Sequence, residues 1–108
     1  MYKLKMDTNE TESGKKLDAG TEVVLRKMDY GTLNNMREQT NKYIKEHGDL
    51  ADGEIPRDVA VNLLKKLVVS PSELKQEQYI DKLSIPDFKG IIEELTNISG
   101  LKKKIEKT

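Results

Sequence analysis

The chain has 108 residues, of which 35% are hydrophobic and 35% are charged, and its 19 basic and 19 acidic residues give a formal net charge of zero. Nucleic-acid binders usually carry a basic excess that neutralises phosphates, so this balance disfavours duplex binding as the main task. The absence of cysteine excludes disulfides, thiolate metal sites and thiol nucleophiles.

Residues 1–20 predict a short strand followed by a polar loop. Tyr2, Leu4 and Met6 alternate with lysines, which is the period of a half-buried strand, and polar residues fill positions 7–14. This segment lacks the apolar region of a signal peptide, and no run in the chain approaches the roughly 18 apolar residues of a membrane span. We therefore expect a cytoplasmic protein that does not enter the membrane.

Residues 21–28 predict a second strand, antiparallel to the first. Val23 and Leu25 would lie on one face of it, and Val24 and Met28 on the other. Two strands alone are marginal in water, so they must lie against helices or against another copy of the protein. An unpaired sheet edge can bind a partner, and Val23 and Leu25 are therefore candidate partner-binding residues.

The first helix is predicted to begin after Asp29, a typical N-cap residue, and to end at Gly48. Met36 and Tyr43 on its apolar stripe are two further candidate partner-binding residues. His47 lies at the helix end, where the helix dipole favours a protonated imidazole, so we assign it no catalytic or metal-binding role. The residues of the stripe, at helical spacing, are Leu33, Met36, Thr40, Tyr43, Ile44 and His47.

Three more helices are predicted in the second half of the chain. Pro56 suits the first turn of the second helix. The sequences SPSE at 70–73 and SIPD at 84–87 each place a serine three residues before a carboxylate, as at a capped helix start. Leu74 and Ile80 are expected to anchor the short third helix. The most hydrophobic face of the chain lies on the second helix and comprises Val59, Ala60, Leu63, Leu64, Leu67 and Val68.

These elements predict an α+β fold, mostly α, in which short N-terminal β elements precede a bundle of about four helices. We expect a single domain over 1–108, with a strand and polar loop at 1–20, a core region at 21–100 and a mobile basic tail at 101–108. The expected core consists of Leu63, Leu64, Leu67, Phe88, Ile91, Ile92 and Leu95.

The tail contains a run of basic residues, Lys102, Lys103 and Lys104. Such a run could contact phosphate or an acidic partner. A basic helix end that complements the helix dipole explains the same residues. Both interpretations stay open at this point.

No motif supplies catalytic chemistry or a cofactor site. The acidic loop with Asp49, Asp52 and Glu54 does not fit a calcium-binding EF-hand, because Leu50 and Val59 fall where side-chain oxygens are required. The sequence contains neither a Gly-rich phosphate loop nor a nucleophile elbow. We therefore expect a protein that is not an enzyme and binds no metal, nucleotide or other cofactor.

Seven positions within about residues 20–100 form a further pattern. They are Leu25 and Arg26 at the end of the second strand, Gly31 and Leu33 in the first helix, and Leu83, Ser84 and Asp87 at the start of the last helix. This order resembles the tail assembly chaperones of long-tailed phages and prophages. The resemblance implies a small, mostly helical protein without enzymatic activity that binds the tape measure protein and assists assembly of tail tube protein. The N-terminal sheet element would give such a protein a binding edge or a contact for a homo-oligomer. Residues 1–20 have no counterpart in the pattern.

Two other classes of function remain open from the sequence. One is a small DNA-binding or regulatory domain in which residues 70–95 form a helix-turn-helix. Its recognition helix would carry Asp87, Glu93 and Glu94, which phosphates would repel. The other is a structural subunit of the virion, such as a head-tail connector.

Overall fold

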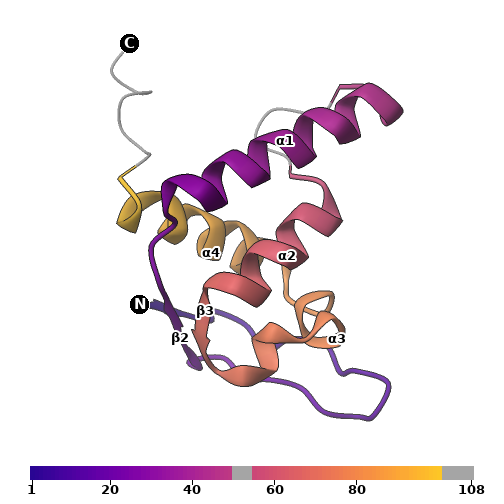
Figure 1. The fold of residues 1–108 in the computed structure, drawn as a ribbon. Helices are drawn as coiled ribbons and strands as arrows, with labels where there is room; N and C mark the ends of the chain where they lie inside the picture. The colour runs from indigo at the N-terminus through magenta and orange to yellow at the C-terminus, as the bar shows by residue number, and fades with distance from the viewer. Residues whose placement is uncertain (50–54, 101–108) are drawn as a thin grey trace.

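The structure is a computed structural model, and it describes residues 1–49 and 55–100 of the chain. Figure 1 shows the order of the elements. They are β1 (Tyr2–Lys3), β2 (Glu22–Leu25), α1 (Tyr30–His47), α2 (Arg57–Leu67), β3 (Val68–Ser70), the 3₁₀ helix η1 (Ser72–Lys75), α3 (Glu77–Ile80) and α4 (Ile85–Ile98). The predicted α+β class, dominated by helix, is confirmed.

The strands form one antiparallel sheet in the order β1-β2-β3. Tyr2 pairs with Val23, so the predicted pairing of the two N-terminal strands is confirmed. The third strand differs from the prediction, which placed Val68 on a helix. The chain leaves α2 at Leu67, and Val68 pairs with Leu25 instead. β2 is therefore the central strand of the sheet.

Local sequence signals account for most of the helix ends. The Asp29 carboxylate accepts a hydrogen bond from the backbone N–H of Thr32 at 2.8 Å, and Gly48 ends α1 with a φ of 94°. Ser84 caps α4 by accepting from the backbone N–H of Asp87. The predicted cap at Ser70 is wrong, because this serine belongs to β3. The expected third helix is divided there into η1 and α3.

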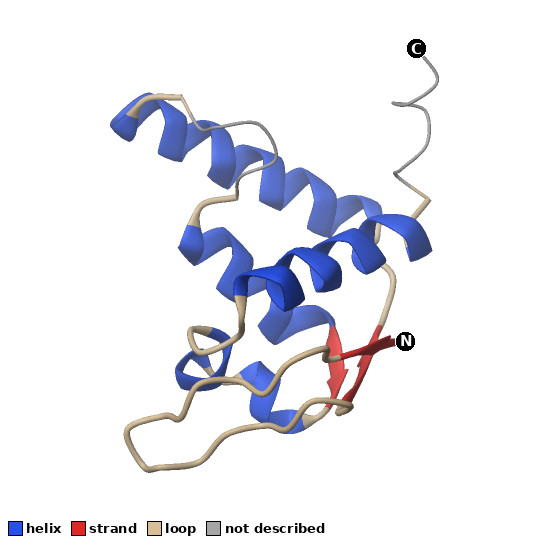
Figure 2. Cartoon of the chain, turned by 180° about the vertical axis from the view of Figure 1, so that it is seen from behind, coloured by secondary structure: helices blue, strands red, loops and turns tan. Residues whose placement is uncertain are grey.

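The core lies around α2, which packs between α1 and α3 (Figures 1 and 2). The prediction is confirmed for Leu63, Leu64, Leu67, Ile91 and Leu95, which are all buried. Phe88 and Ile92 are only partly buried and pack against the cluster. Residues from the sheet and from the α3 region complete the core, namely Leu4, Val23, Val68, Leu74, Tyr79, Ile80 and Leu83.

Helix α1 packs much less tightly than α2. Thr32 is the one buried residue among the 18 of α1, all of which the structure describes. Leu33, Met36, Tyr43 and Ile44 on its apolar stripe are half-buried. The packing of α1 on α2 therefore leaves part of an apolar helix face accessible at the surface.

Candidate partner-binding groove

The accessible stripe of α1 faces a hollow of about 260 Å³ between α1 and α4, with α2 beneath it. Helix α1 contributes Leu33 and Met36 to this hollow, and α4 contributes Ile92 and Leu95. Leu63 of α2 lies at its base. The side chains are almost all apolar, so water in the hollow gains few hydrogen bonds, and an apolar ligand would be favoured over it.

A second hollow of about 280 Å³ lies beside the first, between the beginnings of α2 and α4 and the end of α3. Ile55 lines both hollows, so they are neighbours. Phe88 and Ile85 of α4 line the second one, and Ile85 is 71% exposed. We call the two hollows together the apolar groove. It follows one face of α4 from Ile85 to Thr96.

Hydrogen bonds at both ends of α4 hold this side of the groove in place. At the carboxyl end, the backbone N–H of Met28 donates to the Ser99 hydroxyl at 2.8 Å, which ties the start of α1 to the end of α4. At the amino end, the carboxylate of Asp87 is completely buried. It accepts from the Tyr2 hydroxyl at 2.7 Å and from the backbone N–H groups of Lys5 and Met6 at 2.8 and 3.1 Å.

The Ser84 hydroxyl is the fourth donor to Asp87, at 3.0 Å. Burial on its own raises the pKa of the Asp87 carboxyl, but these hydrogen bonds together outweigh burial and hold the pKa below its ordinary value. The pKa of the Tyr2 phenol shifts in the opposite direction, because burial and the hydrogen bond to Asp87 raise this pKa to about 12. Asp87 is thus charged, and it joins the amino-terminal strand to α4.

Gly90 of α4 makes room for the Tyr2 ring. A Cβ atom at position 90 would lie only 2.5 to 2.7 Å from the Tyr2 hydroxyl and ring. Any larger residue would therefore displace the ring and break its hydrogen bond to Asp87. This contact explains why a glycine occupies the interior of a helix, where it is normally unfavourable.

We expect Gly90→Ala to destabilise the protein by about 1 to 2 kcal/mol, because overpacking against the Tyr2 ring outweighs the better helix propensity of alanine. Urea unfolding followed by circular dichroism measures the effect. In a Tyr2→Ala background the same substitution should be neutral or stabilising, since the clash is then absent. A stabilising effect of Gly90→Ala in the otherwise unchanged protein would contradict this account.

The four candidate residues named from the sequence lie in different environments. Val23 is fully buried in the central strand, so it contributes to the core and has no surface to offer a partner. Leu25 is half-buried and packs against the core. Met36 lines the groove. Tyr43 lies farther along α1 and stacks on His47, with 4.3 Å between the ring centroids.

The sequence did not identify the α4 side of the groove, because Phe88 and Ile92 were assigned to the core. A signal for it was present in the width of the apolar face of α4, which is broader than one buried stripe requires. Lys102, Lys103 and Lys104 lie outside the described residues, as do Asp52 and Glu54 of the acidic loop.

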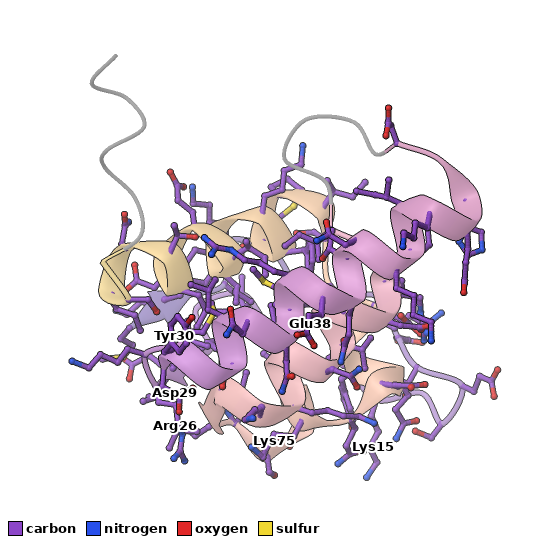
Figure 3. All side chains as sticks on the ribbon, turned by 45° about the horizontal axis from the view of Figure 1, so that its top comes forward. Lys15, Arg26, Asp29, Tyr30, Glu38 and Lys75 are labelled. Atoms are coloured by element: carbon purple, nitrogen blue, oxygen red, sulfur yellow. The ribbon has the colours of Figure 1, made fainter. Side chains whose placement is uncertain are left out.

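Side chains cover backbone groups at or beside the outer strands of the sheet. Next to β1, the Asp87 carboxylate accepts hydrogen bonds from the backbone N–H groups of Lys5 and Met6. The ammonium group of Lys75, which is labelled in Figure 3, donates to the carbonyl oxygen of Val68 in β3 at 2.7 Å and to that of Lys65 in α2 at 2.8 Å. Such coverage reduces the tendency of an outer strand to pair with another chain. The groove is therefore a better candidate for partner binding than the sheet edge.

Among the described residues, no group of three His, Asp or Glu side chains could hold a metal ion. None of the helices in this part of the chain has the length and apolar character needed to span a bilayer. No family model, curated protein or solved structure matches the chain. The function is therefore inferred from the groove and from the sequence pattern.

Proposed function

We propose that this protein is a phage or prophage tail assembly chaperone without enzymatic activity, and that it binds a helical segment of the tape measure protein in the apolar groove. The observation that carries the proposal is a pair of neighbouring hollows. Leu33 and Met36 of the half-buried α1 stripe face Ile92 across a hollow of about 260 Å³. Phe88 lines the second hollow, of about 280 Å³. An amphipathic helix fits such a surface by inserting apolar side chains at i, i+3, i+4 and i+7.

The physical task of such a chaperone matches this surface. Long apolar, helix-prone segments of a tape measure protein would aggregate while the tail tube is still incomplete. A groove that covers their apolar side chains lowers the concentration of exposed segments and delays aggregation. Because burial of apolar surface drives the binding, the complex should survive high salt.

Four of the seven positions that resemble the chaperone family also contribute to the groove or its support. Leu33 lines the hollow between α1 and α4. Ser84 and Asp87 hold the beginning of α4, and Leu83 is buried in the core beside them. Residues 1–20, which had no counterpart in the pattern, supply the donors from Tyr2, Lys5 and Met6 that bind Asp87.

The helix-turn-helix alternative receives less support from the same residues. Helix α3, which would be its first helix, has only four residues. The beginning of α4, which a recognition helix would present to DNA, is joined to Lys5 and Met6 through the buried Asp87. These observations favour a binding partner that is a protein.

A pull-down from co-expression with the neighbouring tape measure and tail tube proteins tests the proposal. We expect the tape measure protein to be retained by the unchanged chain and lost with Met36→Glu, because a carboxylate in the hollow would have to be desolvated on binding. Ile85→Glu should weaken retention as well, and since Ile85 is 71% exposed, this variant should fold normally.

Lys42→Glu is the matched control, because Lys42 lies on the exposed side of α1. It should retain the tape measure protein as well as the unchanged chain does. Failure of the unchanged chain to retain either neighbour would refute the chaperone assignment. Retention of the tube protein alone would instead favour the structural subunit of the virion.

A further inference from the structure

A further hollow, of about 130 Å³, lies between α1 and α2. Met36 and Leu63 line this α1–α2 hollow, and the same two side chains line the hollow between α1 and α4. On α1, Asn35 and Gln39 face the α1–α2 hollow, whereas Leu33 faces the hollow toward α4. Because side chains advance by about 100° per residue around a helix, Met36 lies between these two sets. It therefore borders open space on both sides.

The two shared side chains differ in their freedom to move. Leu63 is only 5% exposed and lies on the buried face of α2. Met36 is half-buried, and its helix has one buried residue, Thr32, among its 18. Methionine is unbranched and has three rotatable side-chain bonds, so it fills spaces of irregular shape. Met36 can therefore turn from one hollow toward the other while the core stays in place.

The opposite wall of the groove is fixed. Ile91 and Leu95 of α4 are buried in the core. Hydrogen bonds to Asp87 and Ser99 join the two ends of this helix to the amino-terminal segment and to the start of α1. A change in the size of the hollow between α1 and α4 must therefore come from the α1 side, where Met36 lies.

We propose that Met36 is a specificity-determining residue, which adjusts the groove to the size of the apolar side chains that a bound helix inserts. When Met36 turns into the α1–α2 hollow, the hollow toward α4 gains room for a large side chain such as phenylalanine. When it turns back, it fills the space beside a smaller one such as leucine, so that no void is left. This inference rests on the proposed function, because it names the class of segment that the groove takes, namely amphipathic helices whose apolar side chains differ in size.

Binding of synthetic peptides tests this adjustment. The parent probe is a fluorescent amphipathic peptide of about four helical turns with leucines at i, i+4, i+7 and i+11. In each further peptide, one of these leucines is replaced by phenylalanine. Fluorescence anisotropy gives the Kd of each peptide for the full chain. Every phenylalanine peptide should bind the unchanged chain within about threefold of the parent, since Met36 makes room for the added volume.

Met36→Ile should remove this tolerance, because a β-branched side chain in a helix is held in nearly one rotamer and cannot turn. At least one phenylalanine peptide should bind this variant about tenfold more weakly than the parent does, as expected of overpacking. Leu33→Ile is the matched control. It places the same residue beside the same hollow, but among the described residues position 33 does not line the α1–α2 hollow. Its tolerance should equal that of the unchanged chain.

A second variant fills the α1–α2 hollow and leaves Met36 in place. Asn62 lines this hollow and is exposed, so Asn62→Phe should fold normally and occupy the space into which Met36 turns. It should produce the same loss of about tenfold for a phenylalanine peptide. Lys65→Phe is its control, because Lys65 is exposed on the same helix and is not among the described residues that line either hollow.

The failures of the two proposals give different results. If either Met36→Ile or Asn62→Phe accepts the phenylalanine peptides as the unchanged chain does, Met36 does not adjust the groove and this inference is wrong. Equal selectivity in Leu33→Ile, or rejection of a phenylalanine peptide by the unchanged chain, also refutes it. If the parent peptide binds the unchanged chain no more tightly than a peptide with serine at the four leucine positions, the groove binds no helix and the proposed function fails as well.

Discussion

Replacing Asp87 by asparagine is expected to lower the free energy of unfolding by about 3 to 5 kcal/mol, because the donors around this position lose a charged acceptor and stay buried. The carboxylate accepts from Tyr2, Lys5, Met6 and Ser84. Asparagine has the same shape, but its NH₂ group would point at donors and leave at least one of them unpaired. Urea unfolding measures the loss.

Asp58→Asn provides the matched control, since this carboxylate is 90% exposed and contacts only the neighbouring Arg57 among the described residues. It should change stability by less than about 0.5 kcal/mol. If Asp87→Asn cost no more than this control, the Asp87 contacts would contribute little to the fold.

Acid titration supplies a second check on Asp87. Its pKa is lower in the folded protein than the ordinary value of 3.8, so its contribution to stability is present above about pH 4 and is lost as the pH falls below that value. The unchanged protein should therefore lose stability more steeply than Asp87→Asn does as the pH falls below about 4. Parallel pH profiles for the two proteins would contradict the low pKa.

Replacing Leu64 by alanine is expected to cost about 2 to 5 kcal/mol, the range for removal of a large buried side chain from a core that relaxes only partly. Leu64 has no exposed surface and lies on α2, at the centre of the buried cluster. Urea unfolding with circular dichroism measures the change. Val69→Ala is the control, because Val69 is 48% exposed and should contribute less than about 1 kcal/mol. A loss under 1 kcal/mol for Leu64→Ala would remove Leu64 from the centre of the core.

Several features of this fold depend only on residues that are close together in the sequence, and these were predictable. The caps at Asp29 and Ser84 each contact a backbone N–H three residues later. Gly48 ends α1 in a conformation that glycine adopts easily. The apolar period of α2 also depends on near neighbours, and its residues form the core as expected.

Other features depend on contacts between distant parts of the chain, and local sequence patterns carry weak or misleading signals for them. Val68 continues the apolar pattern of α2, yet it pairs with Leu25 in the sheet. The same sheet buries Val23, which had been expected to face a partner. A strand becomes central or peripheral only when its neighbours are in place, and local periodicity does not encode this.

The groove itself is a property of the tertiary structure. Sequence spacing alone determined that α1 and α4 are amphipathic, because an apolar stripe arises from the 3.6-residue period of the helix. How much of each stripe is buried was decided by the placement of α4, which Asp87 fixes through Tyr2, 85 positions away. Closing a loop between residues so far apart costs conformational entropy, and only the assembled core offsets this cost. The accessible faces of Met36, Phe88 and Ile92 therefore form only when the complete fold is in place.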